Sequence, residues 1–120
     1  MARPTLVSLA SRFLQENDLP HALRCAQILA DPPSEPAAAY DAAQLYARLA
    51  TLAPSQESRS AYQDRSLQLL KGLVERDYLA LPRLEKEPAF KGLAQHAGFA
   101  EVKRLAAERW PLFTQVKESW

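Results

Sequence analysis

A chain of 120 residues, 48% of them apolar and 24% charged, has the size and composition of one ordinary globular domain, which excludes a second core and a disordered body. Fifteen Lys and Arg residues against 14 Asp and Glu residues leave a formal net charge of +1, so no concentrated positive surface favours nucleic-acid phosphates. The single cysteine excludes an intrachain disulfide, and without a signal peptide or a bilayer-length apolar run we expect a cytoplasmic protein that is not bound to a membrane.

The residue types favour helices. Glycine occurs three times, β-branched residues are few, and no stretch alternates apolar and polar residues with the period of a half-buried strand. We therefore predict an all-α fold of about six helices, built from apolar residues at three- and four-residue spacing. The predicted helical domain covers residues 1–109, and an aromatic tail covers residues 110–120.

The first predicted helix spans residues 4–16, where Pro4 suits the first turn. A turn at Asn17 and Asp18 follows, and Asp18 is expected to cap a second helix that runs to Ala30. Each of these helices has one apolar side, as expected for two helices packed as a hairpin.

The central helix is predicted over residues 37–52, read AAAYDAAQLYARLATL. Its apolar residues form two adjoining faces, so we expect neighbouring helices on both sides of it. Asp41, Gln44 and Arg48 form one stripe at i, i+3 and i+7, the part of this helix expected to meet water.

An exposed loop is predicted at residues 54–60. Ser60 and Gln63 have the spacing of a capping box, so the next helix is expected to start there and to run to about Tyr78. Gly72 inside this helix indicates close contact with another backbone, because glycine costs about 1 kcal/mol relative to alanine in a helix interior.

Beyond an irregular segment with one short turn, Pro88 is predicted to open a short helix that Gly98 ends. The last helix is expected over residues 99–109. The tail then carries large aromatic side chains that either close over the preceding helices or mediate self-association. These are Trp110, Phe113 and Trp120.

Two hairpins follow one template. The motif Leu6-x2-Leu9-Ala10-x2-Phe13 is followed 33 residues later by Ala39-x2-Ala42-Ala43-x2-Tyr46. This spacing is similar to the tetratricopeptide repeat of about 34 residues, in which small residues mark the crossing of two packed helices. Because one hairpin cannot bury its apolar face alone, we expect the two to stack and a C-terminal segment to cap the stack.

A more particular resemblance covers most of the chain. The string Ala39-Tyr40-Asp41-Ala42-Ala43-Gln44-Leu45-Tyr46-Ala47 resembles the Tyr-Asn/Asp-Ala-Ala-Cys-x-Tyr-Ala segment of tetratricopeptide-like regions at the C-terminal end of bacterial, notably planctomycete-type, serine/threonine protein kinases. Downstream, Leu84-x2-Glu87-Pro88-x-Phe90-x2-Leu93-x5-Phe99-x2-Val102 resembles the closing segment of that family. The resemblance implies a scaffold attached to, or cut from, a signalling protein, and no kinase motif occurs in the chain itself.

In such a stack the first helix of each hairpin lines a concave groove. Aligning Ala10 with Ala43 directs one set of side chains toward it: Ser8, Ser11, Gln15, Tyr40, Asp41, Gln44 and Arg48. This mixture can hydrogen-bond a peptide, with Arg48 available for a carboxylate. The competing interpretation is that two repeats curve too little to form a groove, Tyr40 belongs to the core, and the polar stripe is a solvated face.

We expect no metal, cofactor or catalytic site. His21 and His96 stand alone in the sequence, without the converging ligands that a metal needs, and Cys25 lies among apolar residues, where a thiol acts as a small core group. The first functional hypothesis is a non-catalytic scaffold for a protein or peptide partner. The second is a structural or homodimerisation domain, and the third a small enzyme or nucleic-acid binder.

Overall fold

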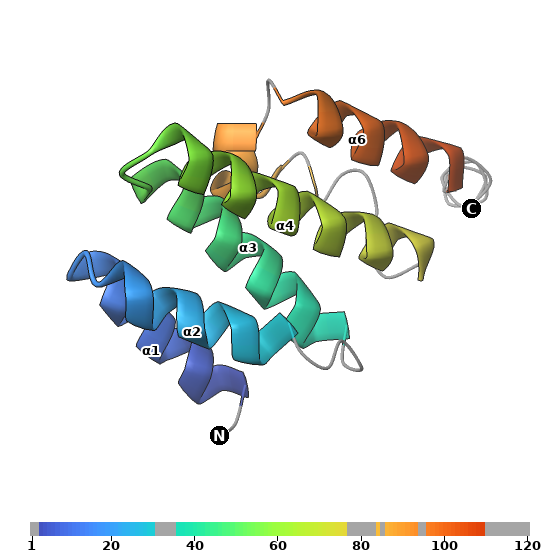
Figure 1. The fold of residues 1–120 in the computed structure, drawn as a ribbon. Helices are drawn as coiled ribbons and strands as arrows, with labels where there is room; N and C mark the ends of the chain where they lie inside the picture. Colours follow the sequence, from blue (N-terminus) through green and yellow to red (C-terminus); the bar gives the residue numbers. More distant parts are fainter. Residues whose placement is uncertain (1–2, 31–35, 77–83, 85, 94–95, 110–120) are drawn as a thin grey trace.

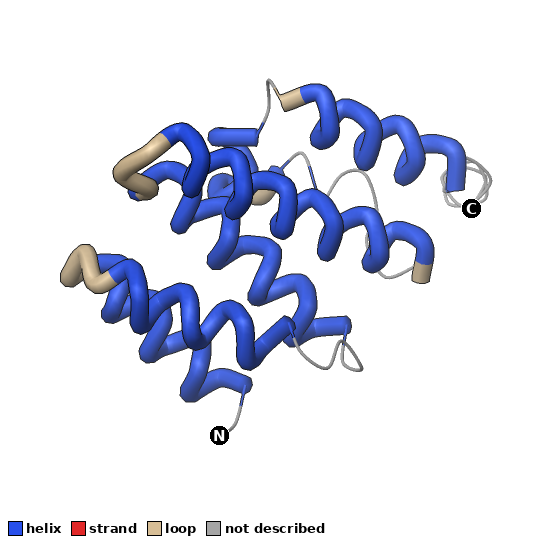
Figure 2. The backbone as a smooth tube through the Cα atoms, in the orientation of Figure 1, coloured by secondary structure: helices blue, strands red, loops and turns tan. Residues whose placement is uncertain are grey.

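Helices make up the described part of this chain. The computed structural model describes residues 3–30, 36–76, 84, 86–93 and 96–109 (Figure 1). They form five α-helices and one 3₁₀ helix: α1 (Arg3–Gln15), α2 (Leu19–Ala30), α3 (Pro36–Leu52), α4 (Gln56–Glu75), η1 (Pro88–Leu93) and α6 (Ala97–Arg109). No strand occurs among these residues (Figure 2), which confirms the all-α prediction.

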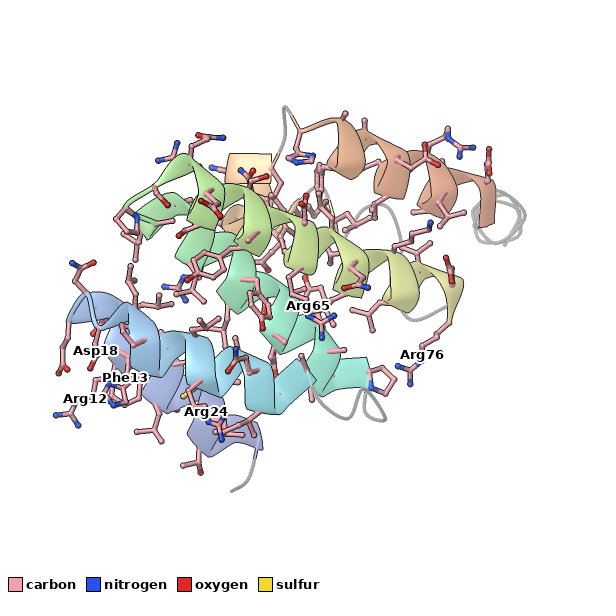
Figure 3. All side chains as sticks on the ribbon, viewed as in Figure 1. Arg12, Phe13, Asp18, Arg24, Arg65 and Arg76 are labelled. Atoms are coloured by element: carbon pink, nitrogen blue, oxygen red, sulfur yellow. The ribbon has the colours of Figure 1, made fainter. Side chains whose placement is uncertain are left out.

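A tight turn joins α1 to α2 and makes them an antiparallel hairpin (Figure 1). Asn17 adopts the left-handed conformation at φ 60°, which asparagine tolerates better than most residues. The Asp18 N–H donates to the Phe13 carbonyl at 2.7 Å and the Asn17 N–H to the Leu14 carbonyl at 3.1 Å, which satisfies the last carbonyl groups of α1. The predicted turn is confirmed, and Figure 3 shows Phe13 and Asp18 at this end of the hairpin.

The central helix α3 is enclosed by its neighbours, as its two apolar faces predict. It packs against α2 on one side, α4 on another and η1 on a third, and it touches α1 less extensively. Its alanines at positions 38, 39, 42, 43, 47 and 50 are all buried. Because an alanine side chain is a single methyl group, these positions let neighbouring helices approach closely.

Ser66 marks the crossing of α3 and α4. Its side chain is fully buried, and its hydroxyl donates a 2.7 Å hydrogen bond to the backbone carbonyl of Ala43. A side-chain hydroxyl reaches the backbone of the facing helix only where the two helices are close. The small residues at this crossing therefore hold the second hairpin together, as the repeat template predicts.

The prediction that Ser60 caps the start of α4 is wrong, because the cap lies five residues earlier at Ser55 and the helix begins at Gln56. Ser55 is its N-cap, and the Ser55 hydroxyl accepts a 3.1 Å hydrogen bond from the Ser58 N–H. Glu57 in the first turn adds a favourable charge at the positive end of the helix. Of the exposed loop predicted at residues 54–60, only residues 54 and 55 lie outside a helix, and both are exposed.

Aromatic contacts dock the C-terminal elements onto the second hairpin. Phe90 of η1 is buried, with its ring edge-on to Tyr40 at a centroid distance of 6.0 Å and tilted against Phe99 of α6 at 6.2 Å. Through these contacts η1 packs on α3, and α6 lies along α4 (Figure 1). The two hairpins are therefore stacked and covered by a C-terminal segment.

Two glycines behave differently from their sequence predictions. Gly98 does not end the short helix, because it lies inside α6. Its N–H donates a 2.9 Å hydrogen bond to Nδ1 of His96, so the His96 side chain caps the start of α6. Gly72 makes no close contact with another backbone, since a Cβ atom placed there would meet nothing within 4 Å.

We predict that Gly72→Ala stabilises the fold. The new methyl group finds open space, and alanine is favoured over glycine in a helix interior by about 1 kcal/mol. Chemical denaturation should show a gain of this size. Gly98→Ala is the control, and it should give no such gain, because its Cβ would lie 2.8 Å from a methyl group of Leu67. A loss of stability in Gly72→Ala would contradict the assignment of open space.

We predict that Ser66→Ala destabilises the protein by about 1 kcal/mol relative to Ser60→Ala, a half-buried serine on the same helix. Both changes bring the same gain in helix propensity, and only the first removes the buried hydrogen bond to Ala43. Urea denaturation of the two variants measures the difference. Equal stabilities would show that this hydrogen bond contributes nothing net.

Candidate functional site

An open cleft of about 440 Å³ lies where α1, α3 and η1 meet. Seven of its eleven lining residues are polar or charged, although apolar atoms form the larger part of the lining surface. The lining residues are Val7, Ser11, Asp41, Gln44, Leu45, Arg48, Thr51, Glu87, Pro88, Lys91 and Gly92. We call this the α1/α3/η1 cleft.

The central helix forms the longest wall of the cleft. Asp41, Gln44, Arg48 and Thr51 follow one another at helical spacing, and each is half-buried or exposed. The remaining faces of α3 are buried against α2, α4 and η1. Since the threonine hydroxyl donates to the Arg48 carbonyl at 2.7 Å, its methyl group is left as the group that faces η1. This polar stripe is therefore the side of α3 that a ligand can reach.

The other walls come from α1 and η1. Val7 and Ser11, one helical turn apart on α1, are both half-buried at the edge of the cleft. Lys91 and Gly92 are exposed on η1, which the buried Phe90 and Leu93 hold against α3. A Cβ atom at Gly92 would lie 3.2 Å from the Thr51 Cγ2 atom, so glycine permits the close approach of η1 to α3.

Both signs of charge line the cleft. Asp41 and Glu87 are acidic, whereas Arg48 and Lys91 are basic. Of the ion pairs among the described residues, none involves Arg48 or Lys91. These two cations are consequently available to a carboxylate, and Gln44 and Ser11 can both donate and accept hydrogen bonds.

Four of the seven predicted groove residues line this cleft, namely Ser11, Asp41, Gln44 and Arg48. Three do not: Ser8 and Gln15 are exposed outside it, and Tyr40 is buried against Phe90 in the core. Ser8 does not line the cleft because it follows Val7 by one residue and therefore points about 100° further around α1.

Sequence reasoning missed the remaining lining residues for two reasons. Thr51 continues the Asp41, Gln44 and Arg48 stripe by three residues, so helical spacing alone could have found it. Glu87 and the η1 residues Pro88, Lys91 and Gly92 reach the cleft through tertiary packing of a segment far away in sequence. The predicted tail residues Trp110, Phe113 and Trp120 lie outside the described residues.

Each of the two histidines has a structural role. His21 Nδ1 lies 2.8 Å from a carboxylate oxygen of Asp18, and its ring packs against Phe13, so it belongs to the α1–α2 turn. His96 caps α6. Among the residues that the structure describes, no three His, Cys, Asp or Glu side chains gather as a metal site. In the same residues, no helix has both the length and the apolar character needed to cross a membrane.

Burial shifts the pKa of two side chains in the core, Cys25 and Tyr46. It raises the pKa of the Cys25 thiol, which lies within the buried side of α2. Burial likewise raises the pKa of the Tyr46 hydroxyl, and a hydrogen bond from Arg65 partly offsets this effect. Because the thiolate is the nucleophilic form, Cys25 is protected as a structural group.

We predict that Cys25 makes stability fall with alkaline pH. Its folded-state pKa is raised, so its contribution is fully present below the thiol pKa of the unfolded chain and is lost as pH rises through the folded-state pKa. Unfolding free energy measured from pH 7 to about pH 10 should decline more steeply for the native protein than for Cys25→Ala. Parallel curves would contradict this assignment.

Comparison of the chain with protein-family models, with curated proteins and with solved structures finds no match.

Proposed function

We propose that this chain is a non-catalytic protein-interaction module whose α1/α3/η1 cleft holds a peptide segment of another protein. The observation that carries the proposal is the coincidence of the polar stripe on α3 with the cleft. The central helix, most of whose other residues are buried, presents Gln44, Arg48 and Thr51 to a space that η1 and α1 also wall.

The chemistry of the lining suits a peptide. A peptide backbone offers N–H and C=O groups at regular intervals, and Ser11, Gln44 and Thr51 carry side chains able to pair with them. Arg48 and Lys91 suit acidic side chains, while Val7, Leu45 and Pro88 give apolar surface between the polar groups. Such a mixture is typical of surfaces that bind other proteins reversibly.

The proposed setting is signalling. Its support is the resemblance of residues 39–47 and of the segment from Leu84 to Val102 to the helical C-terminal region of bacterial serine/threonine kinases. In this proposal the module supplies recognition, and a separate catalytic unit supplies chemistry.

Self-association has less support within the described surface. Ile28 and Leu52 are the large apolar side chains exposed there, and they lie on different helices, α2 and α3. Isolated exposed apolar residues are ordinary in monomeric proteins. Light scattering at micromolar concentration tests this alternative, and a stable dimer would favour it.

Peptide selection tests the proposal. A random 12-residue peptide library displayed on phage should yield binders, and Gln44→Ala with Arg48→Ala should weaken the best synthetic peptide at least about tenfold, because a neutral and a charged hydrogen bond are lost. Fluorescence anisotropy measures the affinity.

The matched control is Arg24→Ala with Gln27→Ala, which removes the same two residue types from the exposed side of α2 (Figure 3). This variant should bind as the native protein does. The proposal fails if the library yields no binder, or if the cleft variant and the control bind equally well.

A further inference from the structure

A second hollow, of about 390 Å³, adjoins the α1/α3/η1 cleft. Its walls come from the C-terminal half of α3, the N-terminal half of α4, and η1. The lining residues are Ala47, Ala50, Thr51, Arg59, Gln63, Gly92 and Leu93. Thr51 and Gly92 line both hollows, so the two spaces meet at this pair.

The rim shared by the two hollows is formed by two exposed residues that lie close together, one of which has no side chain. Gly92 and Thr51 are both exposed, and a Cβ atom on the glycine would lie 3.2 Å from the threonine methyl group. A larger residue would place its side chain over this point. Glycine therefore lets η1 lie close to α3 at the rim that the two hollows share.

The second hollow is cationic. Among the described residues that line it, Arg59 is charged, none is a carboxylate, and Gln63 and Thr51 add neutral polar groups. Arg59 is exposed on the second turn of α4, and it takes part in none of the ion pairs among the described residues. The combined space is thus lined by three cations, Arg48, Lys91 and Arg59, that take part in none of the ion pairs among the described residues, and by the carboxylates of Asp41 and Glu87.

We propose that the two hollows form one continuous groove for an extended acidic peptide, which crosses Thr51 and Gly92 and places a carboxylate side chain beside Arg59. This inference rests on the proposed function and adds the chemical class of the partner. Charge complementarity selects acidic residues, because an arginine that has no carboxylate partner gains charge-assisted hydrogen bonds. An extended chain also leaves its backbone N–H and C=O groups free to pair with the side chains of Thr51 and Gln63, whereas a helix bonds these groups internally.

Two variants test whether the second hollow contributes to peptide binding. Thr51→Trp places an indole over the shared rim, and its control, Leu52→Trp, places the same group on the neighbouring exposed residue, which lines neither hollow. Arg59→Glu reverses the charge of the second hollow. Its control, Arg24→Glu, makes the same change in net charge on α2 (Figure 3), where the residue lines neither hollow.

The experiment selects the random 12-residue phage library separately against the native protein and the four variants, after circular dichroism confirms equal helicity. Native protein, Leu52→Trp and Arg24→Glu should enrich peptides with an acidic residue at a fixed distance from the rest of the motif. Arg59→Glu should replace that acidic residue with a basic one. Thr51→Trp should lose the preference at that position and bind the best native peptide at least about tenfold more weakly.

The inference is overturned if Arg59→Glu and Thr51→Trp select the same peptides as the native protein. In that case the proposed function still stands, because the α1/α3/η1 cleft alone accounts for the motif. If the native protein selects no peptide, the proposed function and this extension both fail.

Discussion

Close approach of helices to α3 is the constraint on which the other features of this structure depend. Six alanines of α3 are buried, and the fully buried Ser66 of α4 reaches across to the Ala43 carbonyl. Larger side chains at these positions would separate the helices and forfeit the dispersion contacts of a tightly packed core. The alanine content of this one helix thus sets how the two hairpins stack.

That packing also decides where a partner can bind. Once α2, α4 and η1 have covered their share of α3, the accessible remainder of the helix is mainly the stripe from Asp41 to Thr51. The stripe becomes the wall of a cleft because η1 stands opposite it. Buried aromatic contacts of Phe90 with Tyr40 and Phe99 hold η1 in this position. The same contacts therefore stabilise the core and position one wall of the cleft.

The proposed groove would select its peptide by charge complementarity. Exposed Arg48, Arg59 and Lys91 offer positive charge on three different elements, α3, α4 and η1. A chain that touches all three must run across the stack, and its binding would couple η1 to both helices of the second hairpin. Because exposed charges interact weakly when taken singly, several of them arranged along one ligand are needed for selectivity.

Helical periodicity and turn chemistry determined the local structure from the sequence alone: the all-α class, the turn at Asn17 and Asp18, the enclosed central helix and its polar stripe. The sequence prediction was wrong at two helix ends where local signals compete. Ser55 and Ser60 can both cap a helix, and Gly98 can either end a helix or lie in its first turn. Only the tertiary structure showed that Gly72 faces open space, that Tyr40 packs on Phe90, and that η1 completes the cleft. The physical reason is the sequence separation of the interacting residues. Hydrogen bonds of caps and turns join residues within about five positions, so local patterns predict them, whereas η1 packs on α3 through residues that are far apart in sequence.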